Sequence, residues 1–143
     1  EACLQGVRDG TIDCLVTDHA PHGRESKEHE FAYAPFGIIG LETALPLFIR
    51  ALIESKLIGW PQLVRAMSTR PAQLLGVPGG TLNVGQPADV TLIDPEVEWT
   101  VDAEQMRSKS RNTPFDGWKV RGRAAGTLVE GEWRHRDGEK VRR

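Results

Sequence analysis

The stretch from Ile12 to His22 constrains the fold of this chain more than any other part of the sequence. The stretch contains a short apolar run, Cys14-Leu15-Val16. Gly10 precedes this run and Pro21 follows it. Such a run between breaking residues is typical of a strand that is buried on both faces, because a buried helix needs more residues. We therefore predict a strand over residues 12–17 in an α/β fold.

Acidic and imidazole groups follow directly after the predicted strand. Asp18 comes first, and His19 and His22 come next, with Pro21 stiffening the turn between them. The carboxyl ends of parallel strands are where catalytic groups collect in α/β proteins. The pattern alone leaves two interpretations, a catalytic group or an Asp18 that caps the next helix beside two solvated histidines.

Two longer segments resemble one enzyme family. The first, Thr17-Asp18-His19-Ala20-Pro21-His22, resembles the last-strand signature of the dihydroorotases, which are metal-dependent cyclic amidohydrolases. The second, Ala34-Pro35-Phe36-Gly37-Ile38-Ile39-Gly40-Leu41-Glu42-Thr43-Ala44-Leu45-Pro46-Leu47, resembles the substrate loop and following helix of the same family, in the same order and spacing. Allantoinases and dihydropyrimidinases share the Asp-His pair, but different residues are expected around His22 and Phe36 in those enzymes.

The resemblance implies a fold and a division of the chain. The expected fold is the C-terminal end of a (β/α)8 TIM barrel plus part of a small flanking β-sandwich. Residues 1–79 would supply the last barrel strand and the C-terminal barrel helices, and residues 80–143 the sandwich portion. A complete barrel takes roughly 250 residues, and no other stretch before residue 80 has a strand pattern. We therefore expect the C-terminal portion of a larger enzyme, inactive by itself.

The resemblance also implies roles for four residues. Asp18 would be the catalytic acid and base and a ligand to one zinc of a binuclear site. His22 and the backbone of Phe36 and Gly37 would hold the carboxylate or ring amide of the substrate, and an imidazole donor with exposed amides suits an anion. The implied reaction is the reversible zinc-dependent cyclisation of N-carbamoyl-L-aspartate to L-dihydroorotate in pyrimidine (UMP) synthesis.

Some features of the family cannot be placed in this sequence. A His-x-His pair, a bridging acid or carboxylated lysine and two further histidines are the other metal ligands, and Asp18 alone cannot hold a zinc. The alternative is therefore a metal-free paralogue that serves as a scaffold for aspartate transcarbamoylase, although intact Asp18 and His22 favour the enzyme. The polar residues 23–34 are expected to form a loop at the active-site mouth, in which His29 is solvated rather than a ligand.

Composition narrows the partners to small molecules or other proteins. The 143 residues carry a net charge of −2, with no basic run suited to nucleic acid and no apolar run long enough for a membrane. Cys3 and Cys14 are too few for a disulfide framework, which favours the cytoplasm. The sequence leaves both a homodimer and a complex with aspartate transcarbamoylase possible. One basic cluster is expected to be a solvated tail, and it comprises Arg134, His135, Arg136, Lys140, Arg142 and Arg143.

Helical patterns occupy much of the first half of the chain. Residues 1–9 have apolar residues at helical spacing and are followed by Gly10, a common helix stop. Residues 40–56 carry the apolar face of an amphipathic helix, within which Pro46 should cause a kink or a break after the first turn.

Two prolines mark further helix starts. Pro61 precedes an apolar face, and Pro71 is expected to open another short helix that ends at Gly76.

The character of the sequence changes at Pro78-Gly79-Gly80, after which strands are expected. The segment ending in Val90-Thr91-Leu92-Ile93-Asp94 resembles the return of the amidohydrolase chain to its small β-sandwich, which implies a strand at 90–94. Alternating apolar and polar residues predict a half-buried strand at 97–101. Further strands are expected near Val120, at 125–129 and around Trp133. Glu130-Gly131 should form a turn, and Asp102 should cap a helical turn over 103–107.

Overall fold

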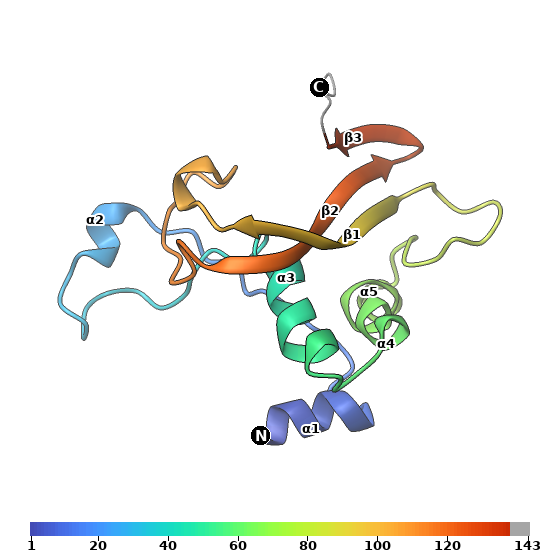
Figure 1. Cartoon of the computed structure of the whole chain (residues 1–143), viewed down its shortest axis with the longest axis horizontal. Helices are drawn as coiled ribbons and strands as arrows, with labels where there is room; N and C mark the ends of the chain where they lie inside the picture. Colours follow the sequence, from blue (N-terminus) through green and yellow to red (C-terminus); the bar gives the residue numbers. More distant parts are fainter. Residues whose placement is uncertain (138–143) are drawn as a thin grey trace.

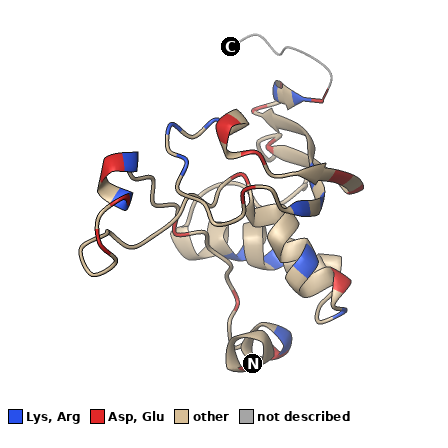
Figure 2. Ribbon diagram, turned by 60° about the vertical axis from the view of Figure 1, so that its left-hand side comes forward, with Lys and Arg blue, Asp and Glu red and all other residues tan. Residues whose placement is uncertain are grey.

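The structure, a computed structural model, describes residues 1–137 and consists of a small sheet with helices on one side of it (Figure 1). Lys140, Arg142 and Arg143 of the basic cluster lie outside the described residues, as does the end of the segment 80–143. Basic residues (Lys and Arg) and acidic residues (Asp and Glu) are both spread along the described part of the chain (Figure 2). No helix among residues 1–137 has the length and apolar character needed to cross a membrane.

Three antiparallel strands form the sheet in the order β1-β2-β3. They are β1 (Val90–Thr100), β2 (Lys119–Val129) and β3 (Glu132–Arg136). In the register of β1 and β2, Val90 lies opposite Leu128 and Thr100 opposite Lys119. Glu130 and Gly131 both have positive φ angles, 52° and 80°, which confirms the predicted turn between β2 and β3.

The two strands predicted at 90–94 and 97–101 form one irregular strand. The register shifts between Asp94 and Glu98. There the Asp94 Oδ1 atom accepts hydrogen bonds from the backbone N–H groups of Glu96 (2.9 Å) and Val97 (3.2 Å). A carboxylate therefore satisfies donors that the β-bulge removes from the ladder, and the strand continues past Pro95.

The helices follow the predicted segments with one difference. Helix α1 (Ala2–Asp9) ends at Gly10, whose φ is 84°. Helix α3 (Ala44–Phe48) continues as the π-helix η1 (Ile49–Glu54), which confirms most of the helix predicted over 40–56. Pro46 does not end it, because a proline in the first turn lacks only an N–H that has no partner within the helix.

The second helical stretch runs without interruption from residue 60 to residue 75. It comprises α4 (Trp60–Val64), the π-helix η2 (Arg65–Thr69) and α5 (Arg70–Leu75), and it ends at Gly76, whose φ is 63°. The start near Pro61 and the end at Gly76 are as predicted. The short helix predicted to open at Pro71 is confirmed as α5, which has Pro71 in its first turn. It differs from the prediction in that α5 continues directly from η2.

Two apolar clusters hold these elements together. One lies within and between the helical stretches and consists of Ile49, Leu52, Ile58 and Leu63. The other joins the loop before α3 to the end of the sheet and consists of Ile39, Val101, Met106 and Val120. Each fully buried side chain of this size contributes about 1.5–3 kcal/mol to folding. At Gly122, whose φ is 85°, an added Cβ would lie 2.4 Å from Ile49 Cδ1, so glycine lets β2 lie directly against η1.

The strand predicted over residues 12–17 does not form in this structure. The segment is irregular, and Leu15 N–H donates to the Ala66 carbonyl (3.0 Å) instead of to a neighbouring strand. Val16, predicted to be buried, is 77% exposed. A strand requires a paired neighbour, and the part of the chain that the structure describes contains one sheet, the antiparallel β1-β2-β3. Residues 1–137 therefore contain no parallel strand with which the predicted barrel strand could pair.

Candidate functional site

Two loops that are separated in the sequence lie against each other in the structure, residues 17–22 and residues 36–40. Ala20 N–H donates to the Ile38 carbonyl (2.9 Å), and Gly40 N–H donates to His19 Nδ1 (3.0 Å). A third hydrogen bond joins His22 Nε2 to the Phe36 carbonyl (2.8 Å). The structure therefore brings His22, Phe36 and Gly37 together, and Asp18 lies in the same loop as His22.

Asp18 has an unusual backbone conformation. Its φ is 46°, in the left-handed region that few residues other than glycine adopt. Aspartate is one of the residues that tolerate this region best. Its side chain is exposed. A backbone outlier of this kind is costly by about 1–3 kcal/mol and is often found where a side chain must be presented to a ligand.

The hydrogen bond to the Phe36 carbonyl selects the ring nitrogen of His22 that carries a proton. Because a carbonyl oxygen only accepts, the His22 Nε2 atom must carry the proton in the hydrogen bond to Phe36. Nδ1 is then the nitrogen left for a ligand. A neutral ring offers a lone pair there, and it donates to an anion through Nδ1 only when it carries a second proton.

His19 contributes to the site by docking the two loops, a role that the sequence pattern did not indicate. Its ring is half-buried, and Nδ1 accepts the Gly40 N–H. The interpretation of His19 as a solvated residue is therefore wrong. His29, in contrast, is exposed beyond the short helix α2 (Arg24–Lys27), as expected for a loop histidine.

Gly37 is required by the close approach of the loops. Its φ is 98°, and an added Cβ would lie 2.4 Å from Ala20 Cβ, which is closer than real carbon atoms come. The Phe36 ring is 95% exposed, so only its backbone takes part in the loop contact. Lys27 Nζ donates to the Pro35 carbonyl (2.8 Å) and to the Gly37 carbonyl (3.0 Å), which fixes this segment from the side of α2.

Asn112 is a further member of the site that sequence reasoning missed. Its Nδ2 atom donates to the Ala20 carbonyl (2.9 Å) and the Gly37 carbonyl (3.3 Å), and its Oδ1 atom accepts from His22 N–H (3.3 Å). Asn112 lies 90 residues from His22, in a segment without periodicity. No local signal in the sequence pointed to it.

An ion pair fixes the beginning of the first loop to the second helical stretch. Arg70 Nε donates to Asp13 Oδ2 at 2.5 Å. The hydrogen bond from Arg70 lowers the pKa of the Asp13 carboxyl below its usual value. Next to it, burial raises the pKa of the Cys14 thiol, and the negative charge of Asp13 raises it further.

The described residues do not fit a complete zinc site. Within residues 1–137 no group of three or more His, Cys, Asp or Glu side chains lies close enough together to hold a metal ion. A zinc ion in an enzyme usually has three protein ligands, and Asp18 by itself provides one carboxylate. The binuclear zinc site that the resemblance implies is therefore not formed by this part of the chain alone.

Curated relatives resemble this chain over nearly its whole length. The dihydroorotase of Geotalea daltonii is 53% identical over 135 residues, which are 94% of this chain and 32% of that protein. The dihydroorotase of Syntrophotalea carbinolica is 50% identical over 95% of this chain and 32% of that protein. The chain thus spans about a third of the length of the curated relatives that it matches.

Solved structures of similar fold are hydantoinases. The L-hydantoinase (dihydropyrimidinase) of Arthrobacter aurescens has a TM-score of 0.88 and 35% identity, and the match covers 96% of this chain and 32% of that one. The D-hydantoinase of a Thermus species has a TM-score of 0.87 and 28% identity, and the match covers 98% and 32%. The amidohydrolase family model matches residues 1–134, so the chain belongs to the amidohydrolase family.

Proposed function

We propose that the protein containing this chain is a dihydroorotase, which interconverts N-carbamoyl-L-aspartate and L-dihydroorotate. The observation that carries the proposal is the hydrogen-bonded contact of His22 with Phe36, which brings the Asp18–His22 loop against Gly37. The 53% identity to a protein named dihydroorotase supports the same assignment. Since the chain covers only 32% of that relative, the activity is proposed for the whole protein.

Asp18 is the proposed acid and base. Opening a cyclic amide requires that the attacking water lose a proton and that the departing nitrogen gain one. A single carboxylate can take the proton from water and return it to the nitrogen. The exposed side chain and left-handed backbone of Asp18 suit a group that is presented to a substrate.

His22 and the backbone of Phe36 and Gly37 are the proposed substrate-binding groups. Both the cyclic and the open form of the substrate carry a carboxylate and an amide. The imidazole of His22 can bind the carboxylate through Nδ1 when both ring nitrogens carry a proton, because Nε2 is engaged with the Phe36 carbonyl. Gly37 lets the second loop lie directly against Ala20 of the first loop, because an added Cβ would lie 2.4 Å from Ala20 Cβ.

Zinc is proposed as the cofactor of the whole protein, with Asp18 as one ligand. When bound, a zinc ion supplies an acidified water and polarises a carbonyl. The described residues do not provide the remaining ligands.

A second candidate function is hydrolysis of hydantoins or dihydropyrimidines, which the 35% identity to an L-hydantoinase favours. A substrate panel separates the two. The intact protein should hydrolyse L-dihydroorotate and form it from N-carbamoyl-L-aspartate. It should be at least 100-fold less efficient with hydantoin and dihydrouracil, because the group that pairs with the substrate carboxylate would be left unpaired. A preference for hydantoin or dihydrouracil would overturn the proposal. Absence of turnover with every cyclic amide would favour the scaffold alternative, for which binding to aspartate transcarbamoylase is the test.

A further inference from the structure

We infer that Asn112 is a positioning residue that fixes the substrate-binding geometry of His22 and Gly37; this inference rests on the proposed function. Asn112 makes hydrogen bonds to both loops of the candidate site, and it comes from neither of them. It lies between η3 (Ala103–Gln105) and β2, in the part of the chain that carries the sheet.

The side-chain amide of Asn112 is matched to its surroundings in one orientation only. The NH2 group faces two acceptors, the carbonyls of Ala20 (2.9 Å) and Gly37 (3.3 Å), and the oxygen faces one donor, the N–H of His22 (3.3 Å). A flipped amide would place oxygen against two carbonyls and NH2 against an N–H. An aspartate would likewise oppose two carbonyls with a carboxylate, so both groups of the asparagine are needed.

The backbone of Asn112 extends the same contact. Its carbonyl accepts from Ile39 N–H (3.1 Å), one residue beyond the Ile38 carbonyl that pairs with Ala20. Loop 17–22 and loop 36–40 are thus joined to each other and to a third segment. Removal of the Asn112 side chain would leave the Ala20 carbonyl and the His22 N–H without this partner in a half-buried position, while the Gly37 carbonyl would keep its hydrogen bond from Lys27 (3.0 Å). Loss of partners in such a position costs more than the loss of exposed hydrogen bonds.

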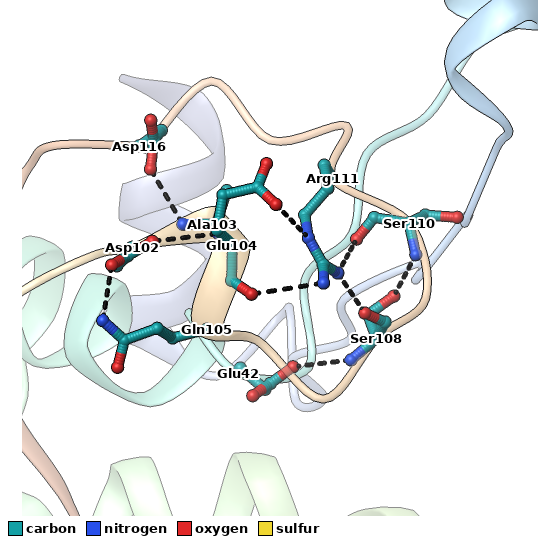
Figure 3. A network of polar contacts seen from close by, with 9 residues as sticks. All are labelled: Glu42, Asp102, Ala103, Glu104, Gln105, Ser108, Ser110, Arg111 and Asp116. Carbon is teal, nitrogen blue, oxygen red and sulfur yellow. Dashed lines mark hydrogen bonds and ion pairs between the residues drawn. The ribbon is translucent and has the colours of Figure 1, made fainter.

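The segment that presents Asn112 is itself ordered by charged side chains (Figure 3). The Arg111 guanidinium points back into its own loop, where it donates to the carbonyls of Glu104 (3.2 Å), Ser110 (3.2 Å) and Ser108. Asp116 Oδ1 accepts from Ala103 N–H (2.8 Å). The chain is therefore fixed on both sides of Asn112, by Arg111 before it and by Asp116 after it. This fixed backbone places the Asn112 side chain against the two loops.

Glu42 connects this segment to the start of α3. Its two carboxylate oxygens accept from the N–H groups of Arg107 (3.1 Å) and Ser108 (3.2 Å). The loop that carries Gly37 leads directly into Glu42 and α3. Residues 37–42 are therefore attached to the segment 107–112 at both ends. Asn112 bonds to Gly37 at one end, and Glu42 bonds to Arg107 and Ser108 at the other.

The kinetic consequence follows from what Asn112 touches. Its partners are the backbone groups of Ala20, His22 and Gly37, and its contacts are not with the Asp18 carboxylate. Loss of Asn112 should loosen the substrate-binding loops and leave the proton-transfer group in place. The effect is expected in KM more than in kcat, since binding is weakened and the chemical step is not removed.

The test compares Asn112→Ala and Asn112→Asp with Asn83→Ala in the intact protein. Asn83 lies in an exposed turn and serves as the matched control. For L-dihydroorotate, Asn112→Ala should raise KM about tenfold and change kcat by less than about threefold, and Asn112→Asp should raise KM at least as much. Asn83→Ala should leave both unchanged. Hydrogen exchange should show faster exchange of the His22 amide in Asn112→Ala only.

Three results would overturn the inference. An unchanged KM in Asn112→Ala would remove Asn112 from substrate binding. A loss of kcat at normal KM, in proportion to the fraction of unfolded protein, would show a purely structural role, and so would failure of both Asn112 variants to fold. If the unsubstituted protein does not turn over dihydroorotate, the proposed function fails separately, and the protection of the His22 amide then decides whether Asn112 positions this loop.

Discussion

The sheet and helices of this protein and the loops of its candidate site are stabilised in different ways. In the first region, regular backbone pairing and two apolar clusters account for the structure. In the second, residues 12–40, Ile39 belongs to one of these clusters, but the contact between the two loops depends on single hydrogen bonds, such as His19 to Gly40 and Asn112 to Ala20. We therefore expect that loss of one of these polar contacts changes the site more than it changes the two clusters.

The largest effect is expected at Asp18, where activity and folding should separate completely. Asp18→Asn should lower kcat for dihydroorotate in the intact protein by about 10²–10⁴-fold, because an amide cannot accept the proton. Asparagine also tolerates a φ of 46°, so thermal unfolding should be unchanged. Steady-state kinetics and calorimetry measure the two quantities.

Asp18→Gly is the matched variant for backbone strain. It should be equally inactive, and it should unfold at the same or a slightly higher temperature, because glycine has no Cβ penalty at positive φ. Substantial activity in either variant would remove Asp18 from the mechanism.

The next largest effect should fall on the core and not on the loops. Leu63 is 1% exposed, in the cluster between the helical stretches. Leu63→Ala should lower the free energy of unfolding by about 2–5 kcal/mol, from lost apolar contact and the cavity that remains. Urea unfolding of the intact protein measures this.

Leu82→Ala serves as the control for the core variant, since Leu82 is 80% exposed. Its effect should be within about 0.5 kcal/mol. KM of the folded fraction should be normal in both variants. A raised KM in Leu63→Ala would show that the loops depend on the core directly.

His22 tests the loop region alone. His22→Ala should raise KM for dihydroorotate by roughly tenfold or more, since the hydrogen bond to Phe36 and the proposed contact with the substrate are both lost. The zinc content of the intact protein should be unchanged. His29→Ala, in an exposed position of the same region, should change neither quantity. Loss of zinc in His22→Ala would make His22 a ligand and contradict its assignment to substrate binding.

The same comparison explains what the sequence could predict. The helix over 44–54, the turn at Glu130-Gly131 and the end at Gly76 follow from periodicity and from local turn chemistry, and all are present. The bulge at Asp94 depends on a side chain that bonds two residues ahead, which an alternating pattern does not encode. Residues 12–17 have the composition of a buried strand, but strand formation depends on a neighbour and not on composition.

Within the site, motif resemblance located Asp18, His22, Phe36 and Gly37, and the structure brings the last three into one contact. Their roles stay predictions. His19 and Asn112 were not found, because their function is to bond backbone groups 21 and up to 92 residues away. Such contacts leave no periodic or local trace. The division of the chain at residue 79 also stays a prediction.

The smallest expected effect concerns pH and the ion pair at the beginning of the loop region. Arg70 lowers the pKa of the Asp13 carboxyl below its ordinary value of 3.8. A lowered pKa in the folded state stabilises the protein above the pKa of the unfolded chain, and this contribution is lost as the pH falls through the lower, folded value. Asp13→Asn should therefore reduce the free energy of unfolding by a constant amount at pH 5–7, and the difference from the unsubstituted protein should shrink below about pH 4.

Urea unfolding of both proteins between pH 3 and pH 7 measures this difference. Both side chains are partly exposed, so the effect should be small and should decrease further in high salt. A difference that grows as the pH falls would have the wrong sign for a carboxylate paired with Arg70. In the comparison of the two regions, the expected result would mean that even the ionic contact that fastens residues 12–17 to α5 contributes less than one buried leucine of the core.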